Sequence, residues 1–255
     1  MVISPHYEWA RAFISRLPDT FDTQGELIYQ KRNVVRRICY GGEEWVVKRY
    51  KTPHLIQRLA YTFWRKGKAE RAYLFAHRLL ALGVDTPEGI AYIERRRGGL
   101  LADSYFLSRY VPYPALFGPL NETEQFDHRL ADSFARFLIG LHEKGILHGD
   151  LNLDNVMYHT DADGALQFSL IDTNRSHFKP SLTRAECLDN LKRISHRRDL
   201  LHYIIRSYAR QRGWDEADAT SAVDEALDWF ERRRAWKREV KAHPWYLLYG
   251  MFKSR

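Results

Sequence analysis

The most constraining feature of this 255-residue sequence is an acidic loop, followed by a second aspartate after a short apolar run. Residues 148–155 read HGDLNLDN, and residues 168–171 read FSLI directly before Asp172. Asp150 and Asn155 stand five positions apart, so one loop presents a carboxylate and a side-chain amide together. The apolar run predicts a buried strand, which places the Asp172 carboxylate at its end, where it is suited to holding a hard divalent cation.

The length and composition are those of a folded protein with one large or two ordinary domains. The residues are 45% hydrophobic, 14% aromatic and 28% charged, which argues against a disordered or fibrous chain. A single hydrophobic core stops growing near this length, and Pro112 and Pro114 interrupt the pattern of strands near the middle. We therefore predict two lobes, residues 1–111 and residues 112–255.

The charge balance points to an anionic partner. The formal net charge is +8 and the isoelectric point is about 9.4, which fits nucleic acid, an anionic membrane surface or a phosphorylated substrate. A nucleic-acid binder is an alternative that rests on this charge alone. Cys39 and Cys187 are too few and too far apart for a disulfide framework, so a reducing, cytoplasmic compartment is expected.

Short-range patterns predict a β-rich first lobe that contains a helical insertion. Residues 26–50 are rich in Val, Ile and Tyr and carry the turn signal YGG at residues 40–42, which predicts an antiparallel meander. Apolar residues recur at helical spacing between residues 54 and 82, so one or two helices follow. Residues 89–97 and 100–111 then predict two further strands.

The second lobe is predicted to be mainly helical. Apolar residues at helical spacing between residues 126 and 144 indicate an amphipathic helix, which Gly145 ends. A short strand pair follows at residues 155–158 and 168–171. The predicted class is therefore α+β, with a small antiparallel β-sheet lobe and a mainly helical C-terminal lobe.

This order of elements resembles the bilobal protein-kinase-like fold, and the acidic residues stand where that fold carries its chemistry. The pattern H-x-D-x-x-x-x-N around Asp150 matches a kinase catalytic loop, whose aspartate accepts the proton of the acceptor hydroxyl. Asn155 and Asp172 are the expected ligands of Mg²⁺ on ATP. Lys48 ends the strand VVK, as does the kinase lysine that binds the α- and β-phosphates, and Glu70 is expected to pair with it.

Two departures from the kinase pattern leave alternatives open. The turn over the phosphates reads YQKRN at residues 29–33 and lacks G-x-G-x-x-G, so Lys31 or Arg32 is expected to replace the backbone amides. Residues 172–174 read DTN in place of DFG, and no A-P-E follows. A protein kinase or small-molecule kinase of this fold, or an inactive pseudokinase-type binding module, is therefore an alternative. For His148 we expect a structural role.

Three segments resemble the bacterial lipopolysaccharide core kinases, which phosphorylate Kdo or heptose. They are residues 141–158, residues 170–175, which read LIDTNR, and residues 69–72, which read AERA. The resemblance implies ATP with Mg²⁺ as cofactors and a sugar hydroxyl of the lipopolysaccharide inner core as acceptor. It also makes Arg175 a candidate for binding an acidic sugar, and no nucleic acid is expected as partner.

The same resemblance bears on location. Inner-core sugars and lipid A carry carboxylates and phosphates, so a cationic enzyme is expected in the cytoplasm, peripheral at the inner face of the inner membrane. Residues 55–64 and 245–252 each read either as an interfacial amphipathic helix or as a helix packed on the lobes. Residues 1–16 lack the apolar segment of a secretory signal, and residues 245–252 fall short of the roughly 20 residues that span a bilayer.

Overall fold

The computed structural model describes residues 1–242, with side chains up to residue 240. Its contacts divide the chain into two compact units. The first unit contains Met1–Gly118 and His148–Phe178, and the second contains Pro119–Leu147 and the chain from Lys179 onward. The acidic loop and Asp172 therefore belong to the same compact unit as the β-rich N-terminal part of the chain.

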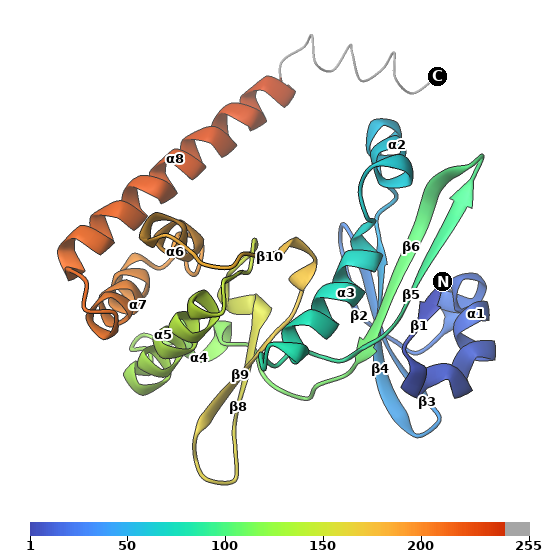
Figure 1. Cartoon of the computed structure of the whole chain (residues 1–255), viewed down its shortest axis with the longest axis horizontal. Coiled ribbons are helices and arrows are strands. Elements are labelled where there is room, and N and C mark those ends of the chain that lie inside the picture. The colour runs from blue at the N-terminus through green and yellow to red at the C-terminus, as the bar shows by residue number, and fades with distance from the viewer. Residues whose placement is uncertain (243–255) are drawn as a thin grey trace. The chain divides into compact units, whose positions relative to one another are not determined.

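A six-stranded antiparallel sheet forms the centre of the first unit (Figure 1). The strands expected between residues 26 and 111 are all present, and a short N-terminal strand adds one edge. In spatial order they are β1 (Val2–Ile3), β5 (Gly89–Arg97), β6 (Leu100–Arg109), β4 (Glu43–Tyr50), β3 (Val34–Tyr40) and β2 (Glu26–Gln30).

The alternating side chains of β4 face two different environments, the hydrophobic core on one side of the sheet and a cavity on the other. Trp45 and Val47 are fully buried in the hydrophobic core, whereas Val46 and Lys48 line a cavity on the other face. Successive side chains of a strand point to opposite faces, so this division follows directly from the sequence order.

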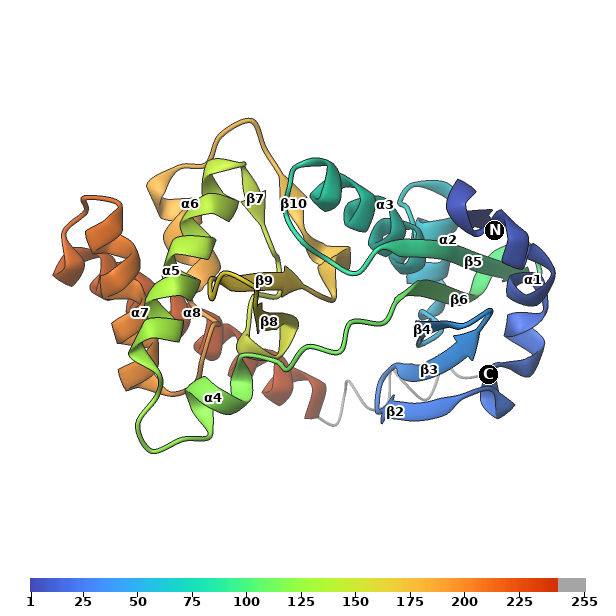
Figure 2. The ribbon, with the colours of Figure 1, turned by 90° about the horizontal axis from the view of Figure 1, so that it is seen from below.

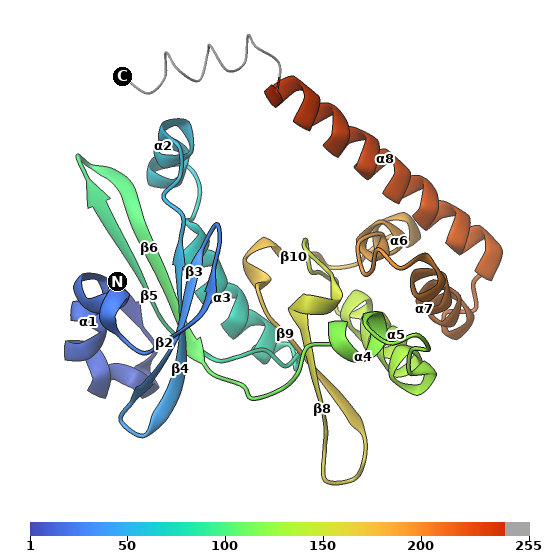
Figure 3. The ribbon, with the colours of Figure 1, turned by 180° about the vertical axis from the view of Figure 1, so that it is seen from behind.

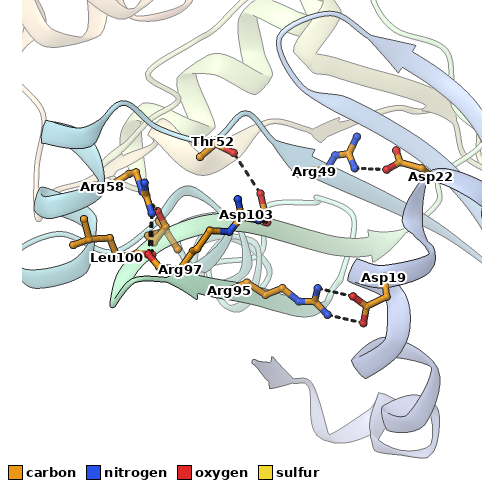
Figure 4. Close-up of polar contacts among 10 residues, drawn as sticks. Asp19, Asp22, Arg49, Thr52, Arg58, Arg95, Arg97, Leu100 and Asp103 are labelled. Carbon is orange, nitrogen blue, oxygen red and sulfur yellow. Dashed lines mark hydrogen bonds and ion pairs between the residues drawn. The ribbon is translucent and has the colours of Figure 1, made fainter. Parts of the chain in front are cut away.

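An N-terminal helical layer covers the Trp45 face, and the sequence patterns did not predict it. It consists of η1 (Pro5–Ala10), α1 (Arg11–Thr20) and η2 (Phe21–Thr23), whose residues Ile14, Leu17 and Phe21 join the buried core. Two ion pairs at its end, drawn in Figure 4, fix it to the strands: Arg95 to Asp19, with both N–O distances 2.7 Å, and Arg49 to Asp22 at 2.8 Å.

Two helices stand between β4 and β5, as expected. The longer one, α3 (Lys68–Ala81), buries Ala69, Ala72, Tyr73, Ala76 and Leu79 and runs along β5 and β6 (Figure 2). The shorter one, α2 (Leu55–Phe63), buries none of its residues. Of the two interpretations of residues 55–64, the structure therefore does not support packing through the large apolar side chains, although α2 contacts β6.

A hairpin carries the acidic loop and the second aspartate. Its strands are β8 (Val156–Thr160) and β9 (Leu166–Leu170), each continued by a single 3₁₀ turn on the side of the site: η3 (Leu153–Asn155) before β8 and η4 (Thr173–Arg175) after β9. The Thr86 hydroxyl donates to the Leu170 carbonyl at 2.6 Å, and α3 packs against η4. The hairpin is thereby fixed to the sheet part of the same unit.

The second unit is helical, as the periodicity predicted (Figure 3). The helix α5 begins after Asp127, whose carboxylate accepts from the Leu130 amide at 3.0 Å, and α6 begins with a capping box between Thr183 and Glu186. Its helices are α5 (His128–Glu143), α6 (Arg184–Leu191), α7 (Arg198–Gln211) and α8 (Glu216–Ala242).

The remaining elements are short. The chain first passes from the first unit to the second within the helix α4 (Phe117–Asn121). The two remaining strands, β7 (Ile146–Leu147) and β10 (His177–Phe178), are only two residues long. Within residues 1–242, no helix combines the length and the apolar character that crossing a membrane requires. The apolar stretch at residues 245–252 lies outside the described residues.

Candidate active site

A cavity of about 680 Å³ lies within the first unit, and three of the six predicted site residues line it. Lys48, Asn155 and Asp172 line it together with Lys31. Its volume is typical of a pocket for a nucleotide-sized ligand. Most of its wall is apolar, including Ile28, Val35, Val46, Ala76, Phe106, Met157 and Ile171.

Lys48 and Asp172 form an ion pair inside this cavity. The distance from Lys48 Nζ to Asp172 Oδ1 is 2.8 Å, and the two side chains are 18% and 30% exposed. The Lys48 ammonium also lies 5.3 Å from the centre of the Tyr50 ring, two residues along the same face of β4. The strand lysine and the aspartate expected to bind metal therefore meet, although 124 positions of sequence separate them.

The backbone of Asp172 adopts a conformation that few residues tolerate. Its φ of 54° and ψ of 41° lie in the left-handed region, and aspartate is among the few non-glycine residues found there. The Asn174 amide donates to Asp172 Oδ1 at 2.5 Å, and Asn174 is also hydrogen-bonded to the buried Tyr50. Burial first, and then the Asp172 charge, raise the pKa of Tyr50 well above its usual value, so its hydroxyl stays protonated.

The Asp150 carboxylate pairs with Arg175 of η4, the turn that follows β9. Arg175 Nη1 lies 3.2 Å from Asp150 Oδ2, and the Asp150 side chain is 20% exposed. The two segments approach closely at Gly149, where φ is +46° and a Cβ atom would stand 2.1 Å from the Arg175 carbonyl oxygen. Only glycine fits at this position without moving the backbone.

Two asparagines fix the shape of the loop. Asn152 Oδ1 accepts from the amides of Asp154 and Asn155 at 3.0 and 3.1 Å and so caps η3. The Asn155 side-chain amide donates to the Asp150 carbonyl at 2.9 Å. Because Asn155 uses its nitrogen in this bond, its Oδ1 is the atom left to bind a cation.

His148 has a structural role, as expected. Its side chain is almost fully buried, and Nε2 donates to the Ile171 carbonyl at 2.9 Å, which joins the loop to the end of β9. Burial lowers the pKa of His148, and the carboxylates of Asp172 and Asp150 offset part of this effect. A buried, neutral imidazole with one nitrogen committed to the backbone is not placed to exchange protons with a substrate.

The expected ion pair between Lys48 and Glu70 is wrong. In the described structure Glu70 pairs with Lys66 at 3.4 Å, and Lys48 pairs with Asp172. The reason is the rotation of α3. Lys68, Arg71 and Phe75 follow the helical spacing of the face that meets η4, whereas Glu70 lies 100° or more from that face, near Tyr92 and Glu94.

Cations gather on the α3 face that meets η4. Burial lowers the pKa of Lys68, and the nearby charges of Arg32, Arg175 and Arg71 lower it further, while Asp172 opposes them. Burial likewise lowers the pKa of Arg71. Four like charges held this close favour an anion between them.

The oxygen atoms of the site fit a hard divalent cation. Asp172 and Asn155 supply a carboxylate and an amide oxygen, the ligand types that Mg²⁺ prefers, and both line the same cavity. Among the described residues no group of three histidine, cysteine or acidic side chains is placed to hold a metal. Two protein oxygens suffice when phosphate oxygens and water complete the shell.

The turn between β2 and β3 stands where the kinase pattern has a glycine-rich loop. Lys31 and Asn33 line the cavity from this turn, together with Tyr29 at the end of β2. Arg32 lies close enough to Lys68 for its charge to lower the pKa of that lysine. The turn therefore presents cationic side chains where a glycine-rich loop presents backbone amides.

Comparisons with known proteins assign the family. The model of the family described as "Lipopolysaccharide kinase (Kdo/WaaP) family" matches residues 30–223, well over half of the sequence. The chain therefore belongs to this lipopolysaccharide kinase family. A comparison with curated protein sequences finds no match.

One solved structure supports the fold, and two others are similar to a lesser degree. The structure titled "WaaP in complex with acyl carrier protein" superposes with a TM-score of 0.59 and 19% identity, covering 91% of this chain and 98% of that chain. The Rio2 kinase of Chaetomium thermophilum, in an ADP/Mg²⁺-phosphoaspartate complex, gives a TM-score of 0.47 and 16% identity over 85% and 69% of the two chains. WbdD gives 0.47 and 18% over 80% and 46%.

Family and fold together define the class of protein. The fold is protein-kinase-like, and this lipopolysaccharide kinase family member is a phosphotransferase that acts on hydroxyl groups. Membership implies the use of ATP with a divalent cation.

Four residues of the site were missed by the sequence patterns: Tyr50, Asn174, Lys68 and Arg71. Tyr50 has a local signal, because it lies two positions after Lys48 on a strand and so shares its face. The spacing of Lys68 and Arg71 places them on one helical face. No local spacing marks Asn174 as a partner of Tyr50.

Proposed function

We propose that this protein transfers the γ-phosphate of ATP to a sugar hydroxyl of the lipopolysaccharide inner core, on Kdo or heptose. One observation carries the proposal. Asp150, Asn155 and Asp172 come from one hairpin and its flanking turns, and Asp172 pairs with the β4 lysine across the cavity. This arrangement provides a base, metal oxygens and a phosphate-binding cation within one compact unit.

We assign Asp150 as the catalytic base. Its carboxylate accepts the proton of the acceptor hydroxyl while the hydroxyl oxygen attacks the γ-phosphorus and the bond to the β-phosphate oxygen breaks, releasing ADP. The arginine contact at 3.2 Å orients the carboxylate.

Nucleotide binding is assigned to the cavity. Its apolar wall suits an adenine ring, and Lys48 lies where a cation is needed for the α- and β-phosphates. Asn155 and Asp172 would hold Mg²⁺, which supplies charge neutralisation on the phosphate oxygens when bound. Lys31 and Arg32 take over the phosphate contacts that a glycine-rich loop makes elsewhere.

An acidic acceptor accounts for the remaining cations. Lys68, Arg71 and Arg175 supply more positive charge than one triphosphate with a bound divalent cation requires. Inner-core sugars carry carboxylates and phosphates. We therefore assign Arg175 to an anionic group of the acceptor sugar, and we place the enzyme at the cytoplasmic membrane face where such acceptors are displayed.

The test is a transfer reaction with ATP, Mg²⁺ and deacylated inner-core oligosaccharide. We expect phosphate on the sugar, detected by mass spectrometry, and none on a generic protein substrate in a parallel reaction. Phosphorylation of the protein in preference to the sugar would contradict the proposed acceptor. Equal transfer by the wild type and by Asp150→Asn would contradict the assigned base.

A binding measurement separates this proposal from an inactive module of the same fold. A ligand that binds the folded state stabilises it in proportion to the logarithm of its concentration over its dissociation constant. We expect ATP to raise the melting temperature only when Mg²⁺ is present. A melting temperature that neither ATP nor Mg²⁺ changes would favour the inactive module.

A further inference from the structure

The helix α2 displays its large apolar side chains to solvent. Its exposed fractions are 60% for Leu55, 64% for Ile56, 38% for Leu59 and 64% for Phe63, and the next residue, Trp64, reaches 78%. We call these five residues the apolar ridge. Isolated exposed apolar side chains are ordinary on protein surfaces, but five within ten residues form a contiguous patch that indicates an interaction surface.

The polar side of the same helix holds α2 against the protein. Arg58 donates from Nε to the Leu101 carbonyl at 2.7 Å and from Nη2 to the Arg97 carbonyl at 3.1 Å, at the end of the β5–β6 hairpin (Figure 4). The Thr62 hydroxyl accepts from the Leu101 amide at 3.0 Å. With Arg58 and Thr62 bonded to the hairpin, the apolar ridge is turned away from it.

Exposed cations follow the apolar ridge in the sequence and lie on the hairpin that holds α2. Arg65 and Lys66 follow it in the sequence, and Arg96 and Arg97 lie at the end of the hairpin to which α2 is bonded. Carboxylates are close to three of the four: Glu70 lies 3.4 Å from Lys66, Asp103 lies 3.9 Å from Arg97, and the charge of Arg96 acts on the partly buried Glu94. Four exposed cations against these three carboxylates leave a net positive charge beside the ridge.

We propose that the apolar ridge and its four cations dock this protein on the surface of an anionic lipid bilayer. Apolar side chains on one side of a short helix, a tryptophan at its end and surrounding arginines and lysines are the features of helices that lie in the membrane interface. A protein partner would require the four cations to find matching carboxylates. Lipid headgroups supply negative charge wherever the ridge lands.

The purpose of membrane docking, which is to bring the enzyme to a lipid-anchored acceptor, rests on the proposed function. The apolar ridge and its four cations belong to the same compact unit as the candidate active site. Docking by this unit would keep the catalytic loop close to the bilayer on which the acceptor sugar is displayed. Binding itself needs neither ATP nor acceptor.

The experiment is flotation of the full-length protein with vesicles of phosphatidylethanolamine containing one third phosphatidylglycerol, and with neutral phosphatidylcholine vesicles. We expect binding to the anionic vesicles to weaken about tenfold or more in Ile56→Gln/Phe63→Gln, because two apolar side chains then fail to insert. Leu80→Gln on α3, also partly exposed at 37%, is the matched control and should bind as the wild type does.

A second pair of variants tests the charge. Arg65→Ser/Arg96→Ser should weaken binding to anionic vesicles severalfold and make the remainder less sensitive to salt, whereas Arg16→Ser, exposed on α1, should have no effect. Equal binding to neutral vesicles would overturn the role of the cations. Undiminished flotation of the Ile56→Gln/Phe63→Gln variant would overturn the role of the ridge.

Activity assays keep this inference separate from the proposed function. The ridge variant should phosphorylate a soluble, deacylated acceptor at the wild-type rate and lose rate only on acceptor embedded in vesicles. Loss of rate on both acceptors would contradict a purely membrane-docking role. Absence of transfer by the wild type would end the proposed function and leave the flotation result untouched.

Discussion

The loop around Asp150 and the helical core around His142 treat buried polar groups in opposite ways. In the second unit, His142 Nδ1 is hydrogen-bonded to the Tyr208 hydroxyl at 2.8 Å and Nε2 to Asn190 Oδ1 at 3.2 Å, so both ring nitrogens are satisfied. In the first unit, the buried hydroxyls of Ser169 and Ser176, on either side of Asp172 in the sequence, find no hydrogen-bond partner among the described residues, and Asp172 stands in the left-handed region.

The difference separates stability from function. A fully hydrogen-bonded buried group rigidifies a core, whereas strained backbone and unpaired polar atoms persist where the surrounding structure enforces them for a chemical purpose. The charged side chains of the site are also partly exposed, Asp150 to 20% and Asp172 to 30%. Changes in the loop should therefore alter activity, and changes around His142 should alter stability.

The largest expected effect is on catalysis. Asp150→Asn should lower kcat about 10²- to 10⁴-fold, because an amide cannot accept the proton of the hydroxyl, while KM for ATP changes little. Steady-state kinetics with the deacylated acceptor measure both constants. Asp163→Asn, in the exposed turn between β8 and β9, is the matched control and should leave kcat unchanged. Stability lost by Asp150→Asn in parallel with activity would contradict the separation.

The next effect is the dependence of stability on pH in the second unit. Burial lowers the pKa of His142 from 6.5 to about 4, so the unfolded chain binds this proton more readily than the folded protein. The contribution of the neutral His142 to the free energy of unfolding should therefore be fully present above pH 6.5. The free energy of unfolding should fall by up to about 3 kcal/mol as the pH drops from 6.5 to 4.

Chemical denaturation at several pH values checks this, with His142→Gln removing the histidine and His6→Gln, 85% exposed, as the control. Across the same interval the wild type and His6→Gln should lose more stability than His142→Gln. Identical pH profiles for the three proteins would show that His142 is not the group that titrates.

A smaller effect should follow from the residues that orient Asp172. Tyr50→Phe removes the hydroxyl hydrogen-bonded to Asn174, and Asn174→Ala removes the 2.5 Å bond to Asp172. Each should lower kcat about tenfold and raise the Mg²⁺ concentration needed for half-maximal rate, as outer-shell partners of metal ligands do. The Mg²⁺ titration is the decisive readout, since loss of stability alone would not shift it. Tyr61→Phe is the control for tyrosine.

The smallest effect concerns the acceptor. Lys68→Ala should raise KM for an acidic acceptor about two- to tenfold, because one of several cations around the anion is lost, with kcat nearly unchanged. Kinetics at low and high salt measure this, and the difference between the two proteins should narrow as salt rises. An increase in KM for ATP instead would move Lys68 from the acceptor to the nucleotide.

Much of the fold and the loop could be predicted from the sequence because their signals are local. Strand alternation places Lys48 opposite the buried Trp45 and Val47, and the loop motif encodes its own turns through Gly149 and Asn152. These features depend on residues a few positions apart, so spacing alone reveals them.

The rest depends on the tertiary arrangement. The choice of Glu70 failed because a helix turns about 100° per residue, and only the packing of α3 on η4 decides which face meets the site. The bond between Tyr50 and Asn174 and the N-terminal layer over Trp45 join segments far apart in the sequence. No local pattern records which distant segment covers a given face.

The most direct test of the central claim is mass spectrometry of the lipopolysaccharide core from cells that lack this protein. We expect the core to lose one phosphate on a Kdo or heptose, wild-type protein to restore it, and Asp150→Asn at equal abundance to leave it missing. A core with its full phosphate content in the absence of the protein, or one restored by Asp150→Asn, would contradict the account.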